Sequence, residues 1–104
     1  LVAIVLCHGV NAQDKARQSA GKPAPDVANY KYGTHQRHVF DLWKAKSDKP
    51  TPLVVFIHGG GFRAGDKGQV SPQMLKLCLD AGISVAAVNY RFSPEVHFPA
   101  HYMD

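Results

Sequence analysis

Two apolar runs, the continuous residues 53–57 and the largely apolar residues 83–88, place the strongest constraint on how this chain can fold. Neither run alternates between apolar and polar residues, which is typical of strands covered on both faces in a parallel sheet. Between them, Ser71 can cap a helix that has Pro72 in its first turn, and Gly82 can end it. The helix would present one apolar face made of Met74, Leu75, Cys78 and Leu79. This order predicts a right-handed parallel crossover and an α/β fold.

Shorter β-type segments precede these runs. Residues 30–33 alternate, a turn follows, and residues 38–43 resume with β-branched and aromatic side chains, which together predict an antiparallel hairpin. Residues 44–52 form a polar, proline-bounded loop. Its three lysines, Lys44, Lys46 and Lys49, are typical of a solvated turn. The net charge of +4 is otherwise spread along the chain, without the dense basic stripe of a nucleic-acid surface.

A glycine-rich segment that can carry chemistry directly follows the first apolar run. Residues 58–68 (HGGGFRAGDKG) hold five glycines at the carboxyl end of a predicted strand, where open α/β sheets bind ligands. Glycine lets backbone N–H groups approach a bound group, and some positions would need positive φ. Two such N–H groups can stabilise a carbonyl oxygen that becomes anionic, each by about 10² to 10³ in rate. We assign this oxyanion hole to Gly60 and Gly61, and we assign loop support by hydrogen bonding to His58.

Several segments resemble the α/β-hydrolase esterases and lipases, a family that includes acetyl xylan esterase-like and feruloyl esterase-like members. In that family an HGGG loop contributes to the oxyanion hole. The matching segments are residues 32–33, 41–43, 58–67, 88–95 and 98–100. The resemblance covers about residues 30–104 and implies the incomplete N-terminal part of an α/β-hydrolase sheet, with an early antiparallel hairpin followed by parallel strands joined by a helix. It also implies that Asp66 and Lys67 stabilise the loop and that residues 90–95 are chiefly scaffold.

The resemblance implies a carboxylic ester hydrolase that uses a serine nucleophile on a G-x-S-x-G elbow and forms an acyl-enzyme. This chain would supply the oxyanion-hole loop but not the nucleophile or the triad. The nearest match places Ser84 in an extended strand and lacks the second glycine. His97 and His101 are expected to be surface or structural residues. We expect the elbow about 20 to 35 residues beyond Asp104, and we expect the 104-residue chain alone to be inactive and poorly soluble.

This mechanism requires no metal and no organic cofactor. The resemblance implies a small-molecule or carbohydrate-linked ester as substrate, with neither a nucleic-acid partner nor a membrane span. Two alternatives stay open. Residues 59–64 formally fit the G-x-G-x-x-A dinucleotide fingerprint, although the following glycines and Pro72 delay the helix that would hold a pyrophosphate. The chain could also belong to a non-catalytic relative, and its oligomeric state is open as well.

The N-terminal residues have the features of a processed leader. Residues 1–7 are uncharged and apolar, too few to span a bilayer, and residues 10–12 fit a small-residue cleavage pattern. We therefore divide the chain into a partial signal peptide (1–12), a polar N-terminal linker (13–29) and the α/β-hydrolase portion (30–104), and we expect a secreted or periplasmic protein. A buried first strand is the alternative for residues 1–7. Cys7 would leave with the leader, so we expect Cys78 to be a core residue without a disulfide partner.

Overall fold

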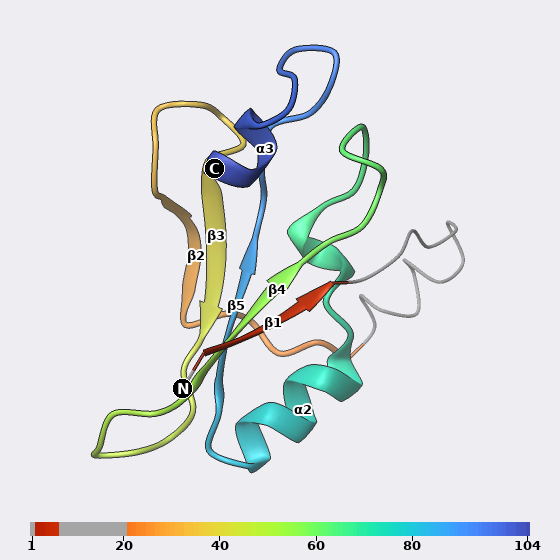
Figure 1. Cartoon of the computed structure of the whole chain (residues 1–104). Coiled ribbons are helices and arrows are strands. Elements are labelled where there is room, and N and C mark those ends of the chain that lie inside the picture. The colour runs from red at the N-terminus through yellow and green to blue at the C-terminus, as the bar shows by residue number, and fades with distance from the viewer. Residues whose placement is uncertain (1, 7–20) are drawn as a thin grey trace.

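The structure is a computed structural model that describes residues 2–6 and 21–104. Within these residues, five strands form one mixed sheet in the order β1-β4-β5-β3-β2 (Figure 1). The elements are β1 (Val2–Leu6), β2 (Val27–Lys31), β3 (Val39–Trp43), β4 (Leu53–Ile57), the 3₁₀ helix η1 (Lys67–Gln69), α2 (Pro72–Asp80), β5 (Ser84–Val88) and α3 (Ala100–Met103). Strands β1, β4 and β5 are parallel, whereas β3 runs antiparallel to both β5 and β2.

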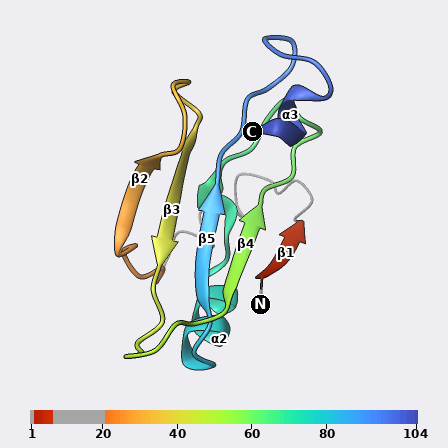
Figure 2. The same cartoon turned by 60° about the vertical axis from the view of Figure 1, so that its left-hand side comes forward.

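The predicted strand–helix–strand unit is present. Strands β4 and β5 lie side by side and parallel, and α2 connects them on one side of the sheet (Figure 2). The Ser71 hydroxyl accepts a hydrogen bond from the N–H of Met74 at 3.1 Å, and Pro72 is the first residue of the helix. Gly82 follows the end of the helix with a φ of 77°. The α/β fold class and the early antiparallel hairpin are therefore confirmed, and β5 begins at Ser84, one residue later than predicted.

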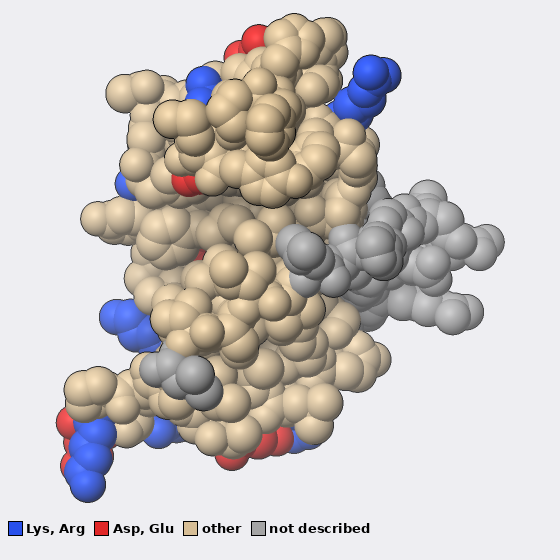
Figure 3. All heavy atoms as spheres, viewed as in Figure 1, with Lys and Arg blue, Asp and Glu red and all other residues tan. Residues whose placement is uncertain are grey.

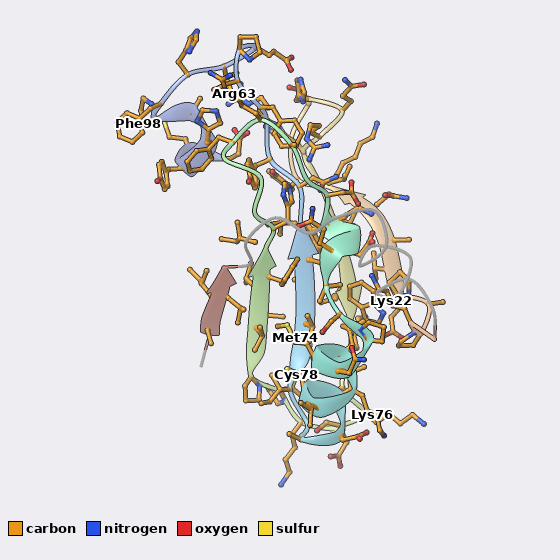
Figure 4. The ribbon with its side chains drawn as sticks, turned by 90° about the vertical axis from the view of Figure 1, so that its right-hand side faces the viewer. Lys22, Arg63, Met74, Lys76, Cys78 and Phe98 are labelled. Carbon is orange, nitrogen blue, oxygen red and sulfur yellow. The ribbon has the colours of Figure 1, made fainter. Side chains whose placement is uncertain are left out.

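Helix α2 covers one face of the sheet. The core under it consists of Trp43, Phe56, Val70, Leu75, Val85 and Ala87. Leu75 is fully buried there, and Met74 and Cys78 pack against the same cluster. Figure 4 shows Met74 and Cys78 on the side of α2 that faces the strands, and Lys76 pointing away from it. Cys78 therefore lies at the core as expected, with a half-buried thiol.

No helix of the described residues covers the opposite face of the sheet. Burial alternates along β4, so that Val54 and Phe56 are buried whereas Val55 and Ile57 are only half-buried. The half-buried pair helps to line an apolar hollow of about 660 Å³ on the uncovered face. The expectation that β4 is covered on both faces is therefore wrong for this part of the chain. The physical reason is that α2 packs on one face only, while α3 lies beyond the carboxyl ends of the strands (Figure 1).

Residues 2–6 form the edge strand β1, in which Ile4 lies opposite Val55 of β4. The side chains of Val2 and Ile4 are 61% and 64% exposed, so β1 differs from the buried first strand considered above. The partial signal peptide stays a prediction, because strand pairing does not test whether a leader is removed. Its cleavage pattern at residues 10–12 and Cys7 lie outside the described residues.

Strand β2 begins at Val27, inside the segment that we expected to be a linker. The residues just before it also contact β3 and the loop that follows it. The indole N–H of Trp43 donates to the carbonyl oxygen of Pro23 at 2.9 Å, and the N–H of Lys44 donates to the Asp26 carboxylate at 2.7 Å. These residues are therefore part of the fold, because their acceptor groups satisfy N–H donors of β3 and of the residue that follows it.

Replacing Leu75 by Ala is expected to lower the free energy of unfolding by about 2–5 kcal/mol, because it removes buried contacts and leaves a cavity. Leu77 lies on the same helix but is 73% exposed, which makes Leu77→Ala a matched control. We expect the control to change stability by less than about 0.5 kcal/mol. Urea unfolding followed by circular dichroism measures both, and equal losses would contradict this assignment of the core.

Candidate active site

The glycine-rich loop lies at the carboxyl ends of β4 and β5 (Figure 1), the end at which open α/β sheets bind ligands. Arg63 belongs to this loop and lies at the same end of the molecule as Phe98 (Figure 4). The glycine turn does not open into a helix, because the short η1 follows and α2 begins only at Pro72. The dinucleotide-binding alternative therefore lacks the helix N-terminus that should face the pyrophosphate.

Three glycines of this loop adopt backbone conformations that disfavour other residues. The φ angle is 131° at Gly60, 59° at Gly61 and 108° at Gly65. A Cβ atom at Gly60 would lie 1.9 Å from the carbonyl oxygen of Ala64, and a Cβ atom at Gly65 would lie 2.2 Å from His58 Nδ1. A Cβ atom at Gly61 would meet no atom within 4 Å. Gly60 and Gly65 are thus required for space as well as for conformation.

The carbonyl oxygens of Gly59 and Gly60 are held within the loop. His58 Nδ1 lies 2.8 Å from the Gly59 oxygen, and the N–H of Arg63 donates to the Gly60 oxygen at 3.1 Å. In a trans peptide, the C=O and the following N–H point in opposite directions. The N–H groups of Gly60 and Gly61 therefore point away from these contacts, and neither donates a hydrogen bond to a residue that the structure describes.

His58 lies buried beneath the loop, with 2% of its surface exposed. Its ring stacks on Tyr90 with the ring centroids 4.4 Å apart, and the Tyr90 hydroxyl donates to the His58 carbonyl oxygen at 2.9 Å. Burial is the largest effect on the pKa of His58 and lowers it; the positive charge of Arg37 lowers it further, while the contact with Gly59 opposes both. The ring is therefore neutral near pH 7.

Polar side chains connect the second half of the loop to β5 and β3. The Asp66 carboxylate accepts from the N–H of Gly68 at 2.7 Å and from Asn89 Nδ2 at 3.1 Å, and Asn89 Oδ1 accepts from the N–H of Lys67 at 2.7 Å. Lys67 Nζ lies 2.7 Å from Asp41 Oδ2, and both side chains are 13% exposed. Burial alone would raise the pKa of Asp66, but the hydrogen bonds from Gly68 and Asn89 outweigh it and lower the pKa. Asp66 and Lys67 therefore stabilise the loop as expected.

Two residues of this site were missed by the sequence analysis. Asn89 was included only in the segment 88–95 that resembles the family, and no role was assigned to Arg37, which lies between the two predicted hairpin strands. Arg37 nevertheless contacts His58, Gly65 and the carbonyl oxygen of Tyr90. No local pattern could identify them, because their partners come from loop segments that are distant in the sequence.

Ser84, His97 and His101, which were not expected to act as nucleophile or base, lie in structural or surface positions. The Ser84 hydroxyl accepts from the N–H of Ala45 at 3.0 Å, at the amino end of β5 and thus at the opposite end from the loop. His97 is exposed. His101 is buried, and its Nε2 lies 3.1 Å from the Ser93 hydroxyl, which itself donates to a backbone carbonyl oxygen.

Residues 2–6 and 21–104 contain neither the side-chain cluster of a metal centre nor the helix of a membrane span. No three His, Cys, Asp or Glu side chains gather there in a way that could hold a metal ion. No helix of this part combines the length and the apolar character needed to cross a bilayer. On the face shown in Figure 3, the Lys and Arg side chains are dispersed around the rim instead of forming a stripe.

Asp104 is a buried carboxylate that ties α3 to the segment after β5. Its side chain is 2% exposed, its Oδ1 lies 2.6 Å from Arg91 Nη2, and its Oδ2 accepts from the N–H of Arg91 at 2.9 Å. His38 Nε2 lies 3.1 Å from Oδ1. Burial alone would raise the pKa of Asp104, but the contacts from Arg91 and His38 outweigh it and hold the pKa at about 2.

The mixed sheet, the crossover and the glycine-rich loop together define part of an α/β-hydrolase fold of the esterase type. The profile of the BD-FAE family matches residues 40–104, and the chain belongs to this family.

Individual relatives agree with this assignment. The carboxylic ester hydrolase LipN of Mycobacterium tuberculosis is 43% identical over 54 residues, which cover 52% of this chain and 14% of that protein. Ethyl acetate hydrolase of Pseudomonas putida is 29% identical over 110 residues, which cover 92% of this chain and 35% of that protein. The structure of an inhibited esterase B from Lactobacillus rhamnosis has a TM-score of 0.60 and 27% identity, covering 88% of this chain and 32% of that one. The chain thus spans 14% to 35% of the length of these relatives.

Replacing Gly65 by Ala is expected to destabilise the protein by clearly more than the same change at Gly82. Both glycines have positive φ, 108° and 77°, so both changes incur the cost of a left-handed backbone, about 1–2 kcal/mol. Only at Gly65 would the new Cβ also collide with His58 Nδ1, at 2.2 Å, whereas at Gly82 it meets nothing within 4 Å. Urea unfolding of the two variants measures the difference. Similar losses would show that the approach of His58 to Gly65 is not required.

We expect Asp104→Asn to lower the free energy of unfolding at pH 7 by on the order of 2 kcal/mol. This is the stability that a carboxyl contributes when folding lowers its pKa from 3.8 to about 2. Because the folded-state pKa is depressed, this stability is present above pH 3.8 and is lost as the pH falls through about 2. Urea unfolding of both proteins at pH 7, 4 and 2 measures it. A difference between them that does not shrink on acidification would rule out the ion pair as its source.

Proposed function

We propose that the protein containing this chain is a serine-dependent carboxylic ester hydrolase, and that the N–H groups of Gly60 and Gly61 form part of its oxyanion hole. The supporting observation is that these two adjacent N–H groups donate to no described residue and lie at the carboxyl end of β4. Preorganised donors of this kind stabilise the charge that develops on a carbonyl oxygen. The esterase relatives and the family membership support the same reaction class.

In the proposed reaction, a serine hydroxyl attacks the ester carbonyl carbon, and a histidine takes its proton. The carbonyl oxygen becomes anionic and accepts hydrogen bonds from Gly60 and Gly61. The alcohol then leaves with a proton from the histidine, and water hydrolyses the acyl-enzyme. Within this chain, His58 holds the Gly59 carbonyl so that the Gly60 N–H faces the substrate. We propose that the serine and its histidine belong to sequence that follows residue 104.

We propose an ester of a short acyl group as substrate, on a small alcohol or on a carbohydrate. The relative named ethyl acetate hydrolase supports the short acyl group. The carbohydrate alternative rests on the family resemblance and on the leader proposed for residues 1–12, which would direct the protein to the periplasm or the exterior. A panel of acetylated xylan and p-nitrophenyl acetate distinguishes the two alcohols.

The decisive experiment compares Gly61→Asp with Gly61→Asn in the full-length protein, with p-nitrophenyl acetate as substrate. A side chain at Gly61 has open space, and both Asp and Asn tolerate its φ of 59°, so the two variants have nearly the same shape and strain. Only Asp places a negative charge beside the developing oxyanion. We expect Asp to lower kcat by at least about 10²-fold, the loss typical of one oxyanion-hole donor, and Asn to lower it much less.

Two outcomes would oppose the proposal. Equal activity of the Asp and Asn variants would place the oxyanion elsewhere. Absence of hydrolysis by the unmodified full-length protein, over a panel of short-chain esters, would favour the non-catalytic alternative.

A further inference from the structure

Arg37 lies in the connection between β2 and β3, yet its guanidinium reaches the loop after β4. Its Nε donates to the carbonyl oxygen of Tyr90 at 2.7 Å, and its Nη2 lies 3.2 Å from the Gly65 oxygen and 3.3 Å from His58 Nε2. Its Cζ lies 3.7 Å from the centroid of the Phe92 ring. One half-buried side chain therefore joins three segments that are distant in the sequence.

The contact with Arg37 determines which nitrogen of His58 carries the proton. A guanidinium has five N–H donors and no acceptor, so His58 Nε2 must be the acceptor in this contact. The proton of the neutral ring then resides on Nδ1, which lies 2.8 Å from the Gly59 carbonyl oxygen. In the other tautomer, Nδ1 would present a lone pair to that oxygen, and the two groups would repel each other.

The Gly59 carbonyl in turn orients the next peptide N–H. Because the Gly59–Gly60 peptide is trans, a carbonyl held toward His58 directs the Gly60 N–H the opposite way. We propose that Arg37 is a positioning residue for the glycine-rich loop: it fixes His58 as the Nδ1–H tautomer and thereby holds the Gly60 N–H in place for the substrate. Its effect on catalysis rests on the proposed esterase function, whereas its effect on the tautomer does not.

The environment of Arg37 explains why an arginine serves here. No carboxylate of the described residues lies within ion-pair distance of it, so its donors are used on two carbonyl oxygens and one imidazole. Only a planar group with divergent N–H donors can reach Tyr90, Gly65 and His58 while stacking on a ring. Lysine would keep the charge but would not reach all three acceptors from one position.

The test uses full-length protein with ¹⁵N-labelled histidine and the variants Arg37→Met and Arg37→Lys. Long-range ¹H–¹⁵N spectra report the protonation of each ring nitrogen. We expect one histidine of the unmodified protein to stay as the neutral Nδ1–H tautomer, and we expect Arg37→Met to convert it to a tautomer mixture. We also expect kcat for p-nitrophenyl acetate to fall by about tenfold to a hundredfold with KM changed less, because a displacement of about 1 Å can cost 10²-fold.

Lys31→Met is the matched control, since Lys31 is an exposed cation on the same hairpin and its side chain bonds to no described residue. We expect it to change neither the spectrum nor kcat. Arg37→Lys keeps one donor and the charge, so it should restore part of the tautomer preference and of kcat, and it replaces Arg37→Met if that variant does not fold.

The outcomes separate this inference from the proposed function. An unchanged tautomer in the Arg37 variants overturns the inference, and so does an unchanged kcat despite a changed tautomer. An unmodified protein that hydrolyses no ester overturns the proposed function, while the spectra still decide whether Arg37 fixes His58.

Discussion

The contact between the His58 ring and the carbonyl oxygen of Gly59 is the interaction on which the candidate site depends. It orients one peptide plane, and that plane determines where the following N–H points. The contact needs a proton on Nδ1, and the acceptance from Arg37 at Nε2 needs a neutral ring, which burial and the charge of Arg37 favour by lowering the pKa of His58. It also needs an adjacent residue without a Cβ atom, which Gly65 supplies. The need for a glycine at Gly65 therefore follows from the position of one buried side chain.

The register of the sheet brings the supports of this histidine together. Ile57 of β4 lies opposite Val88 of β5, so the residues that follow them leave the sheet side by side. His58 consequently meets Tyr90, whose ring stacks on the imidazole. A slip of one residue would turn the side chains of β5 to the other face of the sheet and remove this support. The parallel pairing of β4 and β5 thus contributes to the geometry of the loop as well as to the core.

The sequence predicted those features that depend on local patterns. The apolar run of β4 was predicted to the residue, and the helix face of Leu75 and Cys78 was predicted because helical periodicity is visible in a single segment. That some glycines of the loop have positive φ was also predicted from residue type, and the structure places these angles at Gly60, Gly61 and Gly65. The Arg37 contacts could not be predicted, because a polar residue in a turn has the same local signature whether it faces solvent or a buried histidine. The open face of β4 was missed for the same reason: an apolar run does not show which of its faces is covered.

The distribution of charge around the loop is consistent with binding an oxygen that becomes anionic. The charged side chains at its base are held in contacts of their own: Asp66 by Asn89 and the Gly68 N–H, and Lys67 by Asp41. The N–H dipoles of Gly60 and Gly61 are among the neutral groups that the loop leaves without a hydrogen bond to a described residue. Such dipoles, fixed before a substrate arrives, stabilise a developing charge without reorganising. A free lysine in their place would attract any anion, including a carboxylate product, whereas fixed dipoles favour the tetrahedral oxyanion by their geometry.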